Sequence, residues 1–419
     1  MKALVSKSNI TGRVAALPSK GYTAQALVAA ALTRGASLIR NPWKAEDITI
    51  VTKALSCVGA RITSEQTDWR VDGGELQAPQ GDLYCRESDP ALLFMTALAA
   101  LIPGPTRLIF SPGLSELPIK ALLAALTDLG VSCSLTGNIV AVEGKGKLAG
   151  GKVILAPDTN SLCVSALLLI AARLEQGLII ELPASQCSWP DIAMTIECLR
   201  QFGIGVRIAP DCMRLQVAPQ SFRPATFQVE GDWLQAAYLL ALGASTGDLL
   251  VTNLNAESLQ GERVVLNLMQ KMGVRFTQRS GSVMVMRSLL RAIKTDLADG
   301  ATLLPVLAVL AALIGDESEF RGIIRDCLKE PNRFNALCEG LGKAGMRLTK
   351  GQDTLRVVGA QPQEAVLETY ADGYLVMAFA VLGAAVGNIT ILDADGVDKV
   401  FPGFWRVFRE IGGKAELGD

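Results

Sequence analysis

The residue types in this chain of 419 residues limit the chemistry that it can perform. It contains no histidine, which excludes Ser-His-Asp and Cys-His catalysis, histidine metal sites and imidazole acid–base chemistry. Nine cysteines occur without a CxxC pair, and most have apolar neighbours in the sequence, as buried reduced thiols do. Any proton transfer must therefore use carboxylates, lysines or hydroxyl groups.

The charge balance argues against large charged partners. The net charge of −1 and the isoelectric point near 5.9 provide no basic surface for nucleic acid or an anionic membrane. The longest apolar run, residues 301–315, is interrupted by Pro305 and is too short to span a bilayer. Residues 1–13 carry polar side chains where a signal peptide needs an apolar stretch. We therefore expect a cytoplasmic protein that binds neither nucleic acid nor membranes.

The positions of glycines indicate an internal repeat. One series of glycines follows an apolar helix, a second series follows the next helix, and both advance by about 70 residues. Glycine suits these places because a helix ends readily on a residue that tolerates a positive φ. The chain is therefore predicted to contain six diverged copies of one α/β unit. The first series is Gly35, Gly104, Gly177, Gly247, Gly315 and Gly387, and the second is Gly59, Gly130, Gly203, Gly273, Gly345 and Gly412.

The two helices of a copy differ in their apolar pattern. In the third copy, residues 165–172 are nearly apolar on all sides, whereas residues 192–202 have one apolar stripe and one polar face. We therefore expect one buried helix and one outer helix in each copy. A chain of this length favours two domains, and six copies divide into three plus three. The predicted domains are residues 19–227, and residues 1–18 with 228–419. A single α/β domain with coincidental glycine spacing is the alternative.

Six short motifs occur in a fixed order along the chain. They are Leu17–Lys20 before an alanine-rich helix, Val229–Asp232 with Ala236 and Tyr238, Asp296–Asp299 through Pro305, Leu328–Arg333, Thr369–Asp372, and Asp398–Pro402. In order and spacing they resemble the PGSK, VEGD, DLSD, VKESDR, TYNDHR and SKTFP motifs of the 5-enolpyruvylshikimate-3-phosphate (EPSP) synthase family of enolpyruvyl transferases. The resemblance covers essentially the full length.

This resemblance implies both a fold and a reaction. The fold is α/β, a two-domain inside-out barrel-like arrangement of six βαβαββ-type units, with helices inside, sheets outside and a cleft between the domains. The reaction, part of the shikimate pathway, moves the enolpyruvyl group of phosphoenolpyruvate to a sugar-like hydroxyl, that of shikimate-3-phosphate or a relative, and releases phosphate. It needs no metal and no organic cofactor. The expected partners are these small anionic metabolites, and the expected state is a monomer.

Several charged and polar residues match the family's site positions. The resemblance implies proton transfer by Lys20 and Glu330, and substrate binding by Lys329, Arg333, Lys399, Ser161 and Asp372. Together these groups would form an anion-binding site. The alternative is that they are ordinary solvated charges kept by descent.

Other family positions carry replacements. Gly21 and Gln25 replace a serine and an arginine, Asp89 and Leu93 replace a glycine and an arginine, and Gly113 and Leu117 replace two arginines. Leu162 replaces a glutamine, Thr302 replaces the catalytic aspartate, and Tyr374 replaces an arginine. Arg86 is a candidate compensating cation.

Neutralising one arginine that binds phosphate or carboxylate typically costs about 2–4 kcal/mol. Several such losses together exceed the binding energy of a typical metabolite, about 6–8 kcal/mol. Two hypotheses follow from this balance. The chain is either a divergent enolpyruvyl transferase, with impaired turnover or a less anionic acceptor, or a non-catalytic homologue with a binding or regulatory role. The related UDP-N-acetylglucosamine enolpyruvyl transferases carry a cysteine in the loop matching residues 111–119, which here has none.

Overall fold

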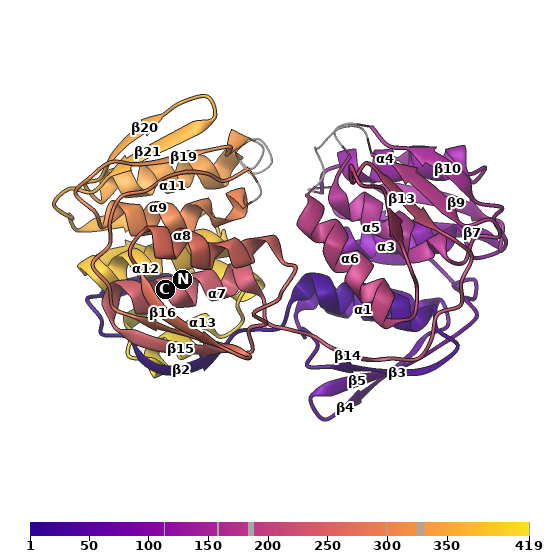
Figure 1. Cartoon of the computed structure of the whole chain (residues 1–419), viewed down its shortest axis with the longest axis horizontal. Coiled ribbons are helices and arrows are strands. Elements are labelled where there is room, and N and C mark those ends of the chain that lie inside the picture. Colours follow the sequence, from indigo (N-terminus) through magenta and orange to yellow (C-terminus); the bar gives the residue numbers. More distant parts are fainter. Residues whose placement is uncertain are drawn as a thin grey trace. The chain divides into compact units, whose positions relative to one another are not determined.

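The computed structural model divides the chain into two compact units, Met1–Leu17 with Gly231–Asp419, and Pro18–Glu230 (Figure 1). The structure describes residues 1–112, 114–156, 159–182, 188–298, 300–324, 327 and 331–418. Each unit has its own helices and its own sheets. No helix in these described ranges is long and apolar enough to cross a membrane.

The described residues form six four-stranded sheets, which share one topology. In each, an edge strand runs parallel to its neighbour, and the two remaining pairs are antiparallel. The predicted α/β class and the six repeated units are confirmed. Every sheet formed by the described residues is open, so none closes into a barrel.

The strand bounds follow the sheet orders. The unit of residues 18–230 contains β14 (Thr226–Gln228), β3 (Gly35–Arg40), β5 (Asp68–Gly73) and β4 (Arg61–Glu65); β6 (Leu83–Arg86), β7 (Gly104–Phe110), β9 (Ile139–Gly144) and β8 (Ser132–Thr136); and β10 (Gly151–Ile154), β11 (Leu178–Glu181), β13 (Arg214–Val217) and β12 (Arg207–Ile208). The other unit contains β16 (Arg275–Arg279), β17 (Ser282–Met286), β15 (Asp248–Thr252) and β2 (Thr11–Ala15); β18 (Lys294–Asp296), β19 (Ser318–Arg321), β21 (Thr354–Val358) and β20 (Arg347–Lys350); and β22 (Ala365–Leu367), β23 (Ile389–Ile391), β1 (Lys2–Ser6) and β24 (Lys414–Gly418).

In chain order, each copy has a buried helix before its second strand and an outer helix after that strand. The third copy confirms the predicted contrast, because α5 is buried from Cys163 to Ala171 whereas α6 buries one stripe only. The buried helices are α1 (Lys20–Ala31), α3 (Asp89–Ala99), α5 (Ser161–Ala171), α7 (Trp233–Thr246), α9 (Leu304–Ala312) and α12 (Gly373–Val386). The outer helices are α2 (Glu46–Cys57), α4 (Leu117–Asp128), α6 (Trp189–Gln201), α8 (Val265–Lys271), α11 (Pro331–Lys343) and α13 (Phe404–Glu410), and short 3-10 turns form η1 (Gly261–Val264), η2 (Ala301–Leu303) and η3 (Ala394–Lys399).

The repeated glycines follow helices as predicted, and most of them adopt a positive φ. All but two of the twelve have positive φ, between 70° and 113°. Gly247 is extended instead, with φ −177°. It is needed for a close approach, since a Cβ there would overlap the carbonyl oxygen of Ile10.

The chain passes from one unit to the other twice. In four copies the first strand leads to the buried helix of its own copy, but β2 is followed by α1 of the other unit, and β14 by α7. The strands keep their places in the sheets, because β2 pairs with β15 and β14 pairs with β3, both in parallel. The N-terminal β1 lies between β23 and β24, so both chain ends belong to the same unit (Figure 1).

Candidate functional site

Side chains at the first turns of several helices contact one another in the unit of residues 18–230. Lys20, the first residue of α1, forms an ion pair with Asp47 in the first turn of α2. Ser88, which caps α3, donates to the backbone carbonyl of Asp47 at 3.4 Å. The repeat explains this arrangement, because every copy delivers its buried helix from the end of a strand. Helix N-termini also favour anions through their unpaired backbone N–H groups and their dipoles.

Lys20 is partly exposed but already has a counter-ion. Its side chain is 37% exposed and that of Asp47 is 21% exposed. A phosphate or carboxylate that bound Lys20 would therefore compete with the Asp47 carboxylate. The predicted partner in proton transfer, Glu330, and the neighbouring Lys329 lie outside the described residues.

Gln25 is part of a buried polar network rather than an anion site. Its Nε2 donates to Oγ1 of Thr195 at 2.9 Å, and that hydroxyl lies 2.7 Å from Oγ of Ser165. The network joins α1, α5 and α6 in the core of the unit. Gln25 is 4% exposed, and its Oε1 accepts no hydrogen bond from the described residues. This position, where the related family has an arginine, has therefore become mainly structural.

Gly21 has room for the side chain that it lacks. A Cβ built on Gly21 would lie 3.5 Å from Cε of Met194, which is ordinary van der Waals contact. A Cβ is therefore accommodated here, so crowding of that atom does not explain the glycine.

Asp89 and the two leucines occupy three different environments. Asp89 is exposed in the first turn of α3, where a negative charge stabilises the helix. Leu93 is 1% exposed within the same helix, whereas Leu117 is 70% exposed at the start of α4. Gly113 lies outside the described residues.

The predicted serine site of the third copy is organised by hydrogen bonds. Oγ of Ser161 donates to Oδ2 of Asp191 at 2.7 Å. The preceding Asn160 caps α5 and accepts from the backbone N of Leu162 at 2.7 Å. The Leu162 side chain is half-buried and offers no polar group.

A second cluster lies within the unit of residues 1–17 and 231–419. Nε of Arg333 donates to Oδ2 of Asp372 at 2.6 Å, and the guanidinium carbon lies 5.1 Å from the ring centroid of Tyr374. Tyr374 in turn stacks on Tyr238, with ring centroids 6.2 Å apart. Asp372 also caps α12 by accepting from the backbone N of Tyr374 and Leu375. The structure therefore brings three predicted positions together.

Tyr374 is an uncharged member of this cluster. Burial, followed by the negative charge of Asp232, raises the pKa of Tyr374 above its ordinary value. Arg333 acts in the opposite direction, and Glu262 and Asp372 add to the increase. A phenol in this environment stays protonated at neutral pH, so Tyr374 supports Arg333 by cation–π contact but adds no positive charge.

Thr302 contacts a carboxylate that sequence reasoning missed. Its Oγ1 donates to Oε1 of Glu262 at 3.0 Å. The carboxylate of Glu262 is therefore the hydrogen-bond partner of this position, whereas Lys399, another predicted cation, lies elsewhere in the unit and is exposed at the end of η3. Glu262 could have been found by searching for acidic residues at helix starts. It lies in the first turn of η1, and Asp47, Asp191 and Asp232 likewise lie in the first turn or at the cap of a helix.

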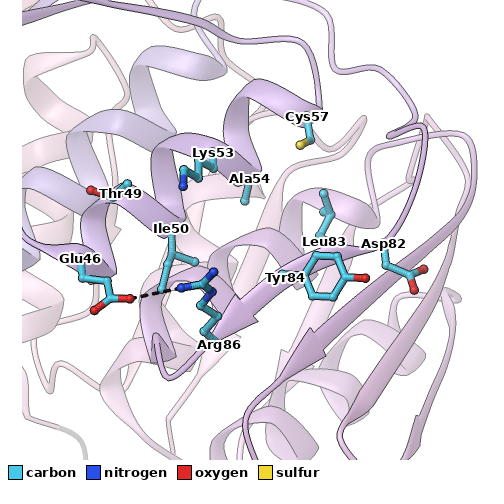
Figure 2. Close-up of a pocket in the computed structure, with 10 residues that line it drawn as sticks. All are labelled: Glu46, Thr49, Ile50, Lys53, Ala54, Cys57, Asp82, Leu83, Tyr84 and Arg86. Atoms are coloured by element: carbon cyan, nitrogen blue, oxygen red, sulfur yellow. Dashed lines mark hydrogen bonds and ion pairs between the residues drawn. The ribbon is translucent and has the colours of Figure 1, made fainter.

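Arg86 does not serve as a free compensating cation. Its NH1 lies 3.2 Å from Oε1 of Glu46, and its φ of 48° places it in the left-handed region. Both residues line a separate pocket of about 530 Å³ between α2 and β6 (Figure 2). Lys53, Cys57 and Tyr84 also line this pocket, and Arg86 is the only candidate residue from the sequence among those that line it.

No group of three carboxylate or thiol side chains in the described part of the chain is arranged to hold a metal ion. Each unit instead has one predicted cation beside a carboxylate in the first turn of a helix, Lys20 with Asp47 in one and Arg333 with Asp372 in the other.

The sequence matches known proteins over nearly its full length. Residues 5–408 match the family model of EPSP synthase (3-phosphoshikimate 1-carboxyvinyltransferase). A 3-phosphoshikimate 1-carboxyvinyltransferase of Dehalococcoides mccartyi is 36% identical over 416 residues, covering 99% of each chain. One from Methanothermobacter thermautotrophicus is 33% identical over 424 residues, covering 100% of each chain.

Solved structures agree on the fold. An EPSP synthase from Acinetobacter baumannii matches with a TM-score of 0.88 and 18% identity, covering 99% of this chain and 100% of that chain. The enolpyruvyl transferase NikO from Streptomyces tendae matches with a TM-score of 0.80 and 17% identity, covering 99% and 98%.

Proposed function

Because the chain belongs to the EPSP synthase family, we propose that it transfers the enolpyruvyl group of phosphoenolpyruvate to a hydroxyl of shikimate-3-phosphate. The observation that carries this proposal is the placement of the retained cations. Lys20 and Arg333 each lie in the first turn of a helix, where the backbone also favours anions. The protein acts as a cytoplasmic monomer on these small anionic metabolites.

The proposed reaction needs one proton acceptor and one proton donor. The acceptor oxygen forms a bond to C2 of phosphoenolpyruvate while C3 gains a proton. The intermediate then loses a proton from C3, and the C2–O bond to phosphate breaks. The hydroxyl proton leaves with the phosphate, so the atoms balance. Lys20 and Glu330 are the proposed acid–base groups, with Lys329, Arg333 and Lys399 binding the anions.

The carboxylates beside the cations predict weak substrate binding. Lys20 faces Asp47, and Arg333 faces Asp372. Each substrate oxygen must displace or share one of these pairs, which reduces the gain from binding. We therefore expect efficient chemistry only at high concentrations of phosphoenolpyruvate.

A less anionic acceptor is a second candidate. The observation that favours it is the buried network of Gln25 with Thr195, which holds an uncharged amide where the family has an arginine. Gly21 likewise lacks the hydroxyl that the resemblance assigns to acceptor binding. Unphosphorylated shikimate is the simplest acceptor of this kind.

Phosphate release by the purified protein tests both candidates. We expect release with phosphoenolpyruvate and shikimate-3-phosphate, and its loss in Lys20→Ala and Glu330→Ala. Lys53→Ala, an exposed lysine of α2, is the matched control and should keep full activity. Release with shikimate alone would favour the second candidate. If high enzyme concentrations give no release, and calorimetry detects no binding of either substrate, the transferase proposal is wrong and a partner-binding role remains.

A further inference from the structure

Thr302 and Glu262 form a hydrogen-bonded pair across two short helical turns. Thr302 lies in η2 and Glu262 in η1, separated by 40 residues in the chain. Oγ1 of Thr302 donates to Oε1 of Glu262 at 3.0 Å, and both side chains are half-buried. By resemblance, Thr302 occupies the position of the family's catalytic aspartate. A carboxylate therefore lies within one hydrogen bond of the place where one is missing.

Several charged groups around this pair belong to the same unit as the retained arginine. Glu262 and Arg333 both act on the ionisation of the same phenol, Tyr374. Asp232, which caps α7, faces that phenol as well, and α7 packs against both η1 and η2. The neighbouring Arg263 directs its NH1 to the carbonyl of Ala256 at 2.9 Å. The pair thus lies in the same unit as the cluster of Arg333, Asp372 and Tyr374.

A threonine hydroxyl cannot act as a base at neutral pH, but it can pass a proton. The hydroxyl that donates to Glu262 keeps lone pairs that can accept a hydrogen bond from another hydroxyl. We propose that Glu262 supplies the missing carboxylate function and acts through Thr302. This inference rests on the proposed enolpyruvyl transfer.

The proton balance of this step is simple. As the acceptor oxygen bonds to C2 of phosphoenolpyruvate, its proton moves to Oγ1 of Thr302, and the Thr302 proton moves to Glu262. When the C2–O bond to phosphate breaks, Glu262 returns its proton to Thr302, and the Thr302 hydroxyl passes a proton to an oxygen of the leaving phosphate. Thr302 touches the acceptor, whereas Glu262 is a positioning residue that receives the proton indirectly. The donor to C3 is a separate group.

Steady-state kinetics of four variants tests the pair. Glu262→Gln keeps an oxygen that can accept from Thr302 but cannot take a proton, so kcat should fall by about 100-fold. The KM values should change by less than about 3-fold, because binding groups are untouched. Thr302→Val should have a similar effect, and the double variant should be no worse than either single variant. Glu257→Gln, an exposed glutamate of the preceding loop, is the matched control and should behave as the unaltered protein.

Restoring the family's carboxylate provides the decisive measurement. In Thr302→Asp combined with Glu262→Gln, kcat should recover at least about 10-fold relative to Glu262→Gln alone. If Glu262→Gln unfolds, Glu262→Asp keeps the charge and should retain part of kcat. Full kcat in Glu262→Gln, or an activity loss that Thr302→Asp does not repair, would overturn the inference while leaving the transferase proposal intact. An unaltered protein without turnover on any acceptor would overturn both.

Discussion

The guanidinium of Arg333 is held by the carboxylate of Asp372, with 2.6 Å between Nε and Oδ2. Both side chains are largely buried, at 19% and 17% exposed. The other oxygen of Asp372 accepts from the backbone N of Tyr374 at 2.9 Å and of Leu375 at 3.1 Å. One carboxylate therefore fixes both the start of α12 and the retained arginine.

This double role predicts different costs for two substitutions of Asp372. Asp372→Ala removes the helix cap and the ion pair, so the free energy of unfolding should fall by about 2–4 kcal/mol. Asp372→Asn keeps an oxygen that can cap α12 and should cost about 1–2 kcal/mol less than the alanine variant. Urea unfolding of both variants measures the difference. Equal losses would show that the cap contributes nothing.

Leu93 is buried and Leu117 is exposed, so we expect substitution by arginine to change the stability of the protein very differently at the two positions. Leu117→Arg places the new side chain in solvent at the start of α4, so stability should change by less than about 0.5 kcal/mol. Leu93→Arg buries a charge in α3 and should cost more than about 4 kcal/mol. Thermal unfolding tests both. Calorimetry with phosphoenolpyruvate should also show tighter binding to Leu117→Arg, and unchanged affinity would argue against the alignment of this position.

Thiol reactivity should follow burial. Burial raises the pKa of Cys85 to about 12 and, in the main, that of Cys338 to about 11, so few thiolates form at these positions near neutral pH. Cys57 and Cys212 are exposed. A thiol reagent applied at about pH 8 should modify Cys57 and Cys212 in the folded protein, and Cys85 and Cys338 only after unfolding. Peptide mapping by mass spectrometry distinguishes these sites, and rapid labelling of Cys85 would contradict the packing of β6.

Protonation of Glu319 in β19 should destabilise the protein at low pH. Hydrogen bonds from Arg356 at 2.7 Å and from Arg321 at 2.5 Å lower the pKa of the Glu319 carboxyl. A lowered folded-state pKa gives stability that is present above the unfolded-state pKa and is lost as the pH falls through the folded-state value. Glu319→Gln should therefore reduce the difference in melting temperature between about pH 7 and about pH 3. The exposed Glu416→Gln is the control, and an equal response of both variants would contradict this assignment.

The repeat could be predicted from the sequence because its signals are local. Helix-ending glycines and the apolar pattern within one helix depend on a few neighbouring residues, and both are found as expected. The contacts of the candidate site instead join residues that are far apart in the sequence. Gln25 and Thr195 are 170 residues apart, and Glu262 and Thr302 are 40 residues apart. A motif identifies the position of a side chain but not the partner that the fold brings to it.

Leu93 and Leu117 also show what the sequence motifs could not predict. Both replace arginines by resemblance, and the residue type alone treats them as equal losses. Their difference comes from the elements that carry them, a buried central helix and the exposed first turn of an outer helix. The depth of a position within a unit is set by the packing of three copies, which no single motif contains.

The placement of β1 and β2 has a consequence for the order in which the chain folds during synthesis. Residues 18–230 contain a complete set of strands and helices, so this unit can fold once β14 has left the ribosome. β2 can pair with β15 soon afterwards, but β1 must wait much longer, because it pairs with β23 and β24 near the other end of the chain. A chain truncated before Ile389 would hold one finished unit beside unpaired strands. Such a fragment would expose open sheet edges, and we expect it to aggregate or to be degraded.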